Sequence, residues 1–148
     1  GSRRNVLLTH LYRRERRAGH AEYEVDHIFP RKKLGDRDYL ENHGVERERV
    51  EWYKDHRDHI ANLQLLSSEG ENQSKSDRDF SEWLERVEEG EVKNLSGTNE
   101  YFETHLIPQD ETKHEYPQFE SFLTGESGRK RFMKHVLKET LPLSSSAQ

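Results

Sequence analysis

Two segments of the chain, Tyr23-Glu24-Val25-Asp26-His27-Ile28-Phe29-Pro30 and Ile60-Ala61-Asn62-Leu63-Gln64-Leu65-Leu66, decide the fold that we expect. The first is rich in β-branched and aromatic residues and ends at a proline, so it predicts a strand over about 23–29. The second is apolar with alternating leucines, and it predicts a second strand. Asp26 and His27 are neighbours, so in an ideal strand their side chains would point to opposite faces. Both can serve one site only if the strand ends or kinks there.

A helix is expected to follow the second segment, beginning near Glu69 with Ser67 or Ser68 as its N-terminal cap. This helix would carry Asn72 and Lys75, which are three residues apart and therefore lie on neighbouring parts of its surface. The two predicted strands and this helix carry a carboxylate, an imidazole, amides and an ammonium group.

The composition limits the classes of protein to consider. The chain has 148 residues, of which 30% are hydrophobic and 36% are charged, so we expect one domain with a small core and a densely charged surface. It contains no run of apolar residues near the length of a membrane span and no signal-peptide pattern. It has no cysteine, which excludes disulfides and cysteine-based zinc sites and fits a cytoplasmic protein.

Positive charge is concentrated at the start of the chain. Residues 1–37 hold ten Lys and Arg against five Asp and Glu, whereas the remainder holds fourteen against twenty-four. Arg31, Lys32 and Lys33 directly follow the first predicted strand, where they could contact a phosphate backbone. The alternative interpretation is a charged loop or face that serves only solubility.

The motif residues carry the groups that phosphodiester hydrolysis requires. Mg²⁺ prefers oxygen ligands and takes only one or two from the protein, and Asp26 and the amide oxygen of Asn72 fit that set. An asparagine rather than a histidine at position 72 favours Mg²⁺ or Mn²⁺ over Zn²⁺ or Ni²⁺. A neutral imidazole can take a proton from water near pH 7, and His27 fits that role.

In order and spacing, Asp26-His27-Ile28 with Pro30, then Asn62, then Asn72 with Lys75 resemble the three-part motif of HNH nucleases, the ββα-metal family. The closest likeness covers about residues 23–84. It is similar to the HNH domain of RNA-guided CRISPR nucleases. It also resembles the C-terminal nuclease domain of GmrSD-type bacterial defence proteins, which pair a ParB-like nucleotide-hydrolysing domain with an HNH domain.

The resemblance implies an α+β fold with a small ββα-metal core, in which two short antiparallel strands and a helix hold one Mg²⁺ or Mn²⁺, surrounded by several helices. It implies that Asn62 supports the loop that orients His27, and that Lys75 contacts the phosphate. The implied activity is Mg²⁺-dependent DNA cleavage, by nicking or by cutting both strands. The implied setting is the effector of a prokaryotic defence protein in the cytoplasm, with a covalently linked N-terminal nucleotide-hydrolysing or sensor domain.

We therefore divide the chain into four segments: an N-terminal helix and basic segment over 1–22, the HNH core over 23–88, a helical C-terminal extension over 89–141 and a disordered tail over 142–148. Outside the motif we expect a helical turn at 38–41, a surface helix over 45–57, a helix over 79–87, a linker over 88–97, a helix over 99–106, a mobile loop over 109–116 and a helical hairpin over 119–141.

Two other functions compete with nuclease activity. The first is a DNA-binding module that keeps the HNH fold but does not catalyse. The second is a metal-binding interaction module built on His56 and His59, whose spacing on a helix can bind zinc, although two further ligands would be needed. Cleavage of plasmid DNA would separate the first from a nuclease, and tightly held zinc would favour the second.

Overall fold

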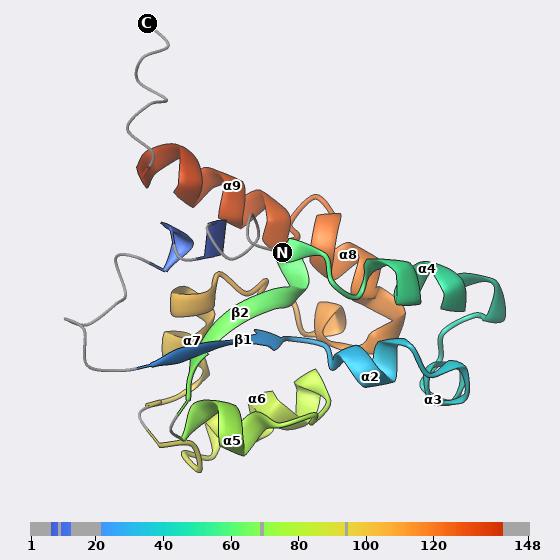
Figure 1. Ribbon diagram of the computed structural model, residues 1–148, viewed down its shortest axis with the longest axis horizontal. Helices are drawn as coiled ribbons and strands as arrows, with labels where there is room; N and C mark the ends of the chain where they lie inside the picture. The colour runs from blue at the N-terminus through green and yellow to red at the C-terminus, as the bar shows by residue number, and fades with distance from the viewer. Residues whose placement is uncertain (1–6, 9, 13–21, 69, 94, 141–148) are drawn as a thin grey trace, which may run out of the picture.

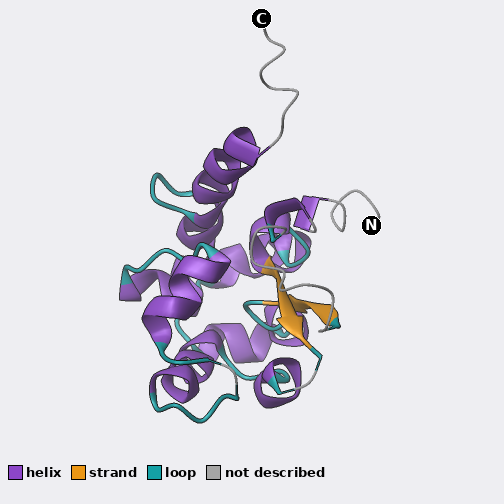
Figure 2. Cartoon of the chain, turned by 90° about the vertical axis from the view of Figure 1, so that its left-hand side faces the viewer, coloured by secondary structure: helices purple, strands orange, loops and turns teal. Residues whose placement is uncertain are grey.

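The computed structural model describes residues 7–8, 10–12, 22–68, 70–93 and 95–140. Most of the predicted N-terminal helix and basic segment, and the whole tail over 142–148, lie outside the described residues. The fold is α+β, with one small sheet among helices (Figures 1 and 2). None of the described helices is long and apolar enough to cross a membrane.

The sheet consists of β1 (Tyr23–His27) and β2 (Leu63–Ser67), which pair antiparallel from Tyr23↔Ser67 to His27↔Leu63. This confirms both predicted strands. The second strand begins later than expected, because residues 60–62 form the 3₁₀ turn η3 (Ile60–Asn62). The backbone N–H of Ile28 donates to the carbonyl of Asn62 at 2.8 Å, so this turn remains attached to the end of β1.

Helix α5 (Glu71–Lys75) follows β2 and packs against it. The prediction that Ser67 or Ser68 caps this helix is wrong, because the cap position is Gly70 with φ of 90°. A residue with a side chain is strained in that left-handed region, which explains the glycine. The carboxylate of Glu71 instead accepts a hydrogen bond from the backbone N–H of Ser67 at 2.8 Å and ties the helix to the strand.

The segment that connects the two strands folds into short helices beside the sheet: α2 (Arg31–Leu34), α3 (Arg37–Asn42), the 3₁₀ turn η2 (Arg47–Arg49) and α4 (Val50–His56). The predicted helical turn at 38–41 is confirmed as α3, which begins where the side chain of Asp36 accepts from the N–H of Tyr39. The helix predicted over 45–57 begins only at Val50, and it buries Val50 and Tyr53.

The rest of the described chain wraps around the sheet as α6 (Phe80–Glu88), α7 (Thr98–His105), η4 (Glu111–His114), η5 (Tyr116–Gln118), α8 (Phe119–Thr124) and α9 (Arg129–Thr140). In Figure 1, α9 runs above the sheet while α5 and α6 lie below it. The segment 109–116, predicted as a mobile loop, forms η4 and the start of η5, and the side chains of His114 and Tyr116 are buried.

Phe29, two residues after His27, is the centre of the aromatic core. Its ring contacts four others with centroid separations of 5.1 to 5.6 Å, namely Phe80, Tyr116, Phe119 and Phe122. All five side chains are buried. Aromatic rings in such tilted and edge-to-face arrangements stabilise a core beyond the area that they bury. The C-terminal half of the chain therefore holds the end of β1 in place.

Arg129, the first residue of α9, is fully buried beside the start of β2. Its guanidinium donates to the carbonyl oxygens of His105 at 2.9 Å, Ala61 at 3.2 Å and Leu63 at 2.5 Å, and to the hydroxyl of Tyr12 at 3.3 Å. A buried charge is tolerated only when its donors are satisfied, and here carbonyl groups satisfy them. Arg129 thereby fixes α7, α9 and η3 to one another.

We predict that His105 makes the fold sensitive to acid. Its buried ring contacts the hydroxyl of Tyr12 at 2.6 Å, and burial, with Arg129 close by, lowers its pKa to about 3. In the unfolded chain the imidazole of residue 105 binds a proton below about pH 6.5, whereas in the folded chain it stays neutral down to about pH 3. Between these values each pH unit of acidification lowers the free energy of unfolding by up to about 1.4 kcal/mol. Chemical denaturation across pH 4–7 should show a shallower loss of stability in His105→Gln. The exposed His135, replaced by Gln, is the control. Equal slopes in wild type and His105→Gln would contradict this prediction.

Candidate functional site

Asp26 lies buried at the centre of the site. Gln64 stands directly across from it on β2, and the Gln64 side-chain N–H donates to Oδ2 of Asp26 at 2.9 Å. The ammonium of Lys75 lies 3.0 Å from the same oxygen. The other oxygen, Oδ1, has no hydrogen-bond partner among the described residues. The carboxylate is thus held in place through Oδ2.

Lys75 reaches into this site from α5. Its side chain is 0% exposed, and its Nζ donates to the backbone carbonyl of His27 at 2.9 Å as well as contacting Asp26. Burial lowers the pKa of Lys75, and the neighbouring carboxylate of Asp26 opposes that shift. A side chain without exposed surface cannot reach a phosphate outside the protein, so the expectation that Lys75 contacts DNA is not met in this structure. Its position is that of an internal counter-charge.

His27 is the last residue of β1 and directly follows Asp26. Its Nε2 lies 2.8 Å from Oδ1 of Asp58, and Arg31 donates to both oxygens of the same carboxylate, at 2.9 and 3.2 Å. These contacts lower the pKa of Asp58 to about 2; the hydrogen bond from Arg31 is the largest cause, and burial opposes it. Asp58 was not predicted, because nothing in its local sequence separates it from other loop aspartates.

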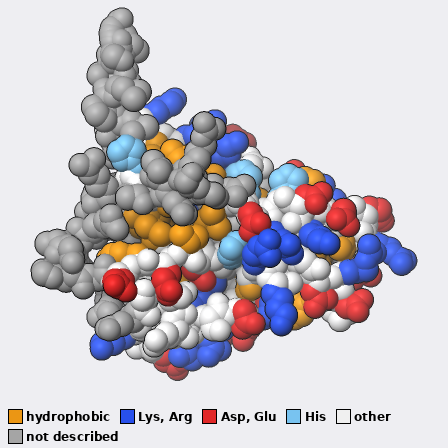
Figure 3. All heavy atoms as spheres, in the orientation of Figure 1, with side chains coloured by type: hydrophobic (Ala, Val, Ile, Leu, Met, Phe, Trp, Pro, Cys, Tyr) orange, Lys and Arg blue, Asp and Glu red, His pale blue; other side chains and the backbone are white. Residues whose placement is uncertain are grey.

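Two of the three basic residues of α2 are already paired. Arg31 is bound to Asp58, and Lys33 donates to Asp79 at 3.2 Å. Lys32 is exposed and forms no ion pair with any residue that the structure describes. The face of the molecule seen in Figure 3 mixes acidic and basic side chains. The predicted phosphate contacts of Arg31 and Lys33 would therefore require these ion pairs to open, whereas Lys32 is available as it stands.

Asn62 is fully buried and supports the chain beyond His27. Its Oδ1 accepts from the N–H of Phe29 at 2.8 Å, while its Nδ2 donates to the carbonyls of Phe29 at 3.1 Å and Arg57 at 2.9 Å. Both the oxygen and the nitrogen of the side-chain amide are therefore hydrogen-bonded to the backbone. It has the geometry of a supporting residue and does not itself approach a substrate.

Asn72 lies nearer the surface, over the same face of β1 as Asp26. Its Nδ2 donates to Oε2 of Glu24 at 2.7 Å. Glu24 and Asp26 are two residues apart on a strand and so point to one face, along which α5 places Asn72 and Lys75. Asn72 and Asp26 do not contact each other directly. Glu24 was missed by sequence reasoning, although the alternation of the strand could have indicated it.

The donors on this face fit a hard divalent cation. Asp26 Oδ1, the carboxylate of Glu24 and the amide oxygen of Asn72 are all oxygen ligands, which Mg²⁺ and Mn²⁺ prefer. No three His, Asp or Glu side chains within the described ranges form a ready metal cluster. The fit is therefore to an ion that takes few protein ligands and keeps its waters, as Mg²⁺ commonly does.

The rival histidine pair does not converge. The ring of His56 stacks on Trp52 at 3.9 Å, and its Nδ1 lies 2.8 Å from the carbonyl of Trp52. His59 lies beyond the end of α4, and its Nδ1 accepts from the N–H of Ala61 at 3.0 Å. Each imidazole forms a hydrogen bond with the backbone close to it in sequence, and this argues against a zinc site shared by the two.

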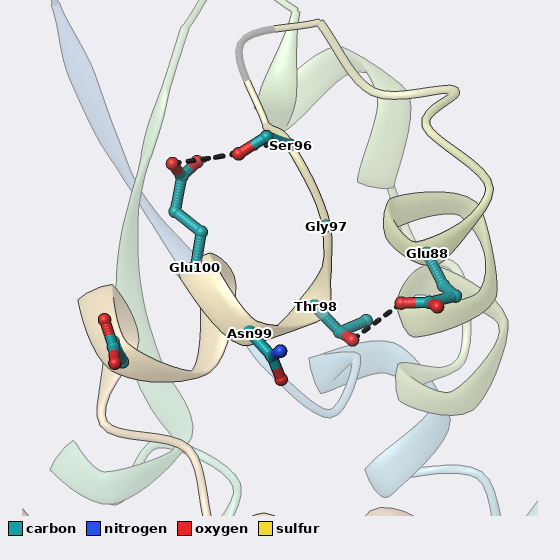
Figure 4. A pocket seen from close by; sticks show the side chains of 7 residues that line it. Glu88, Ser96, Gly97, Thr98, Asn99 and Glu100 are labelled. Carbon is teal, nitrogen blue, oxygen red and sulfur yellow. Dashed lines mark hydrogen bonds between the residues drawn. The ribbon is translucent and has the colours of Figure 1, made fainter.

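A separate hollow of about 530 Å³ lies at the turn before α7 (Figure 4). It is lined by Glu88, Ser96, Gly97, Thr98, Asn99, Glu100 and Glu103. The carboxylate of Glu100 accepts from the hydroxyl of Ser96 at 3.0 Å, and that of Glu88 accepts from Thr98 at 2.8 Å. None of the motif residues lines this hollow, and its carboxylates would repel a phosphate.

No protein-family model and no curated protein matches this sequence. The interpretation of the site consequently depends on the geometry of the motif residues themselves.

We predict that Asn62 contributes mainly to stability. Replacing it by Ala leaves one N–H and two carbonyls near the end of β1 without their partner, and unsatisfied buried groups of this kind cost about 1–3 kcal/mol each. Urea denaturation should show a loss of about 3 kcal/mol. Asn72→Ala, which removes a single contact near the surface, is the matched control and should lose far less. Equal losses in the two variants would contradict the supporting role.

Proposed function

We propose that this chain is an HNH endonuclease domain that hydrolyses phosphodiester bonds in DNA with the help of Mg²⁺ or Mn²⁺. One observation carries the proposal: three distant parts of the sequence, which contain Asp26-His27, Asn62 and Asn72 with Lys75, meet in one unit of two antiparallel strands and a helix. The order of these elements, β1, β2 and α5, is the order that the ββα-metal resemblance implies.

The side chains divide the chemical tasks between them. His27 takes the proton from the attacking water, since a neutral imidazole accepts a proton readily near neutral pH. Asp26 and Asn72, with Glu24 beside them, would hold the divalent cation. When bound, the cation supplies positive charge that screens the phosphate and stabilises the leaving oxygen. Lys75 holds the carboxylate of Asp26 and the backbone of His27 in fixed relation.

The wider biological setting belongs to the same proposal. By resemblance, the domain would be the effector of a prokaryotic defence protein that acts in the cytoplasm and carries an N-terminal nucleotide-hydrolysing or sensor domain. The resemblance of the motif to that of the GmrSD-type defence proteins is what supports this setting.

A non-catalytic DNA-binding module remains the second candidate, and one observation favours it. The ammonium of Lys75 already lies 3.0 Å from Asp26 and neutralises it. A divalent cation beside this ammonium meets electrostatic repulsion, which weakens metal binding. Cleavage assays decide between the two candidates.

We predict cleavage of supercoiled plasmid in Mg²⁺ or Mn²⁺ and none in excess EDTA. His27→Ala should lower the rate by about a hundredfold or more, because the proton acceptor is lost. The exposed His135, replaced by Ala, should cleave like wild type. Undiminished cutting in EDTA, or an active His27→Ala variant, would refute the assignment.

We further predict that Lys32 contacts the phosphate backbone of DNA and that Lys33 stabilises the fold. We expect Lys32→Ala to reduce by about one the slope of the logarithm of the DNA association constant against the logarithm of salt concentration. One fewer counterion is then released from the DNA on binding. Lys33→Ala should instead lower the unfolding midpoint, because it removes the cationic partner of Asp79, whose carboxylate otherwise accepts only from the hydroxyls of Tyr39 and Tyr116 among the described residues. The measurement is fluorescence anisotropy with labelled duplex DNA over a range of salt concentrations. If Lys33→Ala reduced the slope and Lys32→Ala left it unchanged, the roles of the two residues would be the reverse of those predicted.

A further inference from the structure

Asp58 forms a contact with His27 that the motif does not include. It lies between α4 and η3, beyond the helix that carries His56, and its side chain is 40% exposed while that of His27 is 25% exposed. Its Oδ1 lies 2.8 Å from Nε2 of His27, which is a normal hydrogen-bond length. Two segments separated by 31 positions in sequence are thus joined at the end of β1.

Arg31 holds this carboxylate in place. The Nε of Arg31 donates to Oδ1 of Asp58 at 2.9 Å, and its Nη2 donates to Oδ2 at 3.2 Å. A two-point contact of this kind fixes the plane of a carboxylate as well as its position. Since Arg31 keeps Asp58 ionised, the carboxylate can only accept hydrogen bonds. The proton in the contact must therefore belong to Nε2 of His27.

We infer that Asp58, held by Arg31, is a positioning residue that fixes the imidazole of His27 with Nε2 as donor and leaves Nδ1 as the atom that accepts a proton from water. A neutral imidazole has one donor nitrogen and one acceptor nitrogen, so the identity of the donor decides which nitrogen can act as base. This inference rests on the proposed function for its catalytic meaning.

The other charged groups near His27 do not provide the same restraint. Lys75 contacts its backbone carbonyl and not its ring, and the carboxylate of Asp26 is engaged by Gln64 and Lys75. Among the described residues, Asp58 is the partner that restrains the ring. A merely structural surface pair of Asp58 and Arg31 would contribute little to stability, because water and salt screen ion pairs between exposed side chains.

The test uses three variants of the whole chain: Asp58→Ala, which removes the acceptor; Asp58→Asn, which keeps an acceptor oxygen; and Asp55→Ala, a matched control on the exposed face of α4. The ring N–H of His27 is observed by ¹H–¹⁵N NMR in alkaline buffer, where histidine side chains are neutral. In wild type, Asp55→Ala and Asp58→Asn we expect a downfield ring N–H signal that exchanges slowly with water. In Asp58→Ala this signal should be lost to fast exchange.

Plasmid cleavage gives the second readout. Asp58→Ala should lower kcat by about ten- to a hundredfold, by analogy with the partners that orient metal-ligating histidines, while KM changes little. Asp58→Asn should lose less, and Asp55→Ala should match wild type. A His27 ring signal that survives in Asp58→Ala, or an equal loss of kcat in Asp55→Ala, would overturn the inference. The NMR measurement needs neither metal nor DNA, so absence of cleavage by the wild type would refute the proposed function separately.

Discussion

The buried ion pair between Asp26 and Lys75 is the contact on which the arrangement of the site depends. It joins β1 to α5, and the carbonyl of His27 accepts a second bond from the same ammonium. Removing two charges from water is costly, and the cost is offset only when further hydrogen bonds complete the geometry. Gln64 supplies one of them from the opposite strand. The folded chain thus keeps a carboxylate near the surface of a small core, in a fixed orientation.

A series of polar contacts connects this site to the C-terminal part of the protein. The hydroxyl of Tyr101 on α7 donates to the Oε1 of Gln64 at 2.6 Å, and its ring lies against His105. Arg129 then joins the backbone of His105 to that of Leu63. Residues beyond position 88, which the sequence presented as an extension, therefore hold the residue that orients Asp26. Loss of α7 or α9 would disturb the site without touching any motif residue.

The sequence predicted the strands and most helices, because these follow from local periodicity and spacing. The grouping of the motif residues was implied by the resemblance alone; within that group Lys75 contacts Asp26 and the backbone of His27, whereas Asn72 contacts Glu24. The sequence did not predict contacts between distant polar groups. The resemblance implied that Lys75 contacts the phosphate, and its burial could not be foreseen because lysines are seldom fully buried. Arg31 pairs with Asp58 and Lys33 with Asp79 because of the position that α2 takes in the folded chain, which local sequence does not indicate. The glycine cap of α5 was missed because Ser67 and Ser68 offered an equally good local signal.

In the proposed function, the face formed by Glu24, Asp26 and Asn72 binds a divalent cation. Paramagnetic Mn²⁺ tests it directly, because the ion broadens the NMR signals of nuclei close to it. Titration with Mn²⁺ should first broaden the side-chain amide signals of Asn72 and Gln64, and Mg²⁺ should reverse the effect by competition. Broadening that begins instead at the acidic hollow around Glu88 and Glu100, with the Asn72 and Gln64 signals unchanged, would contradict the claim.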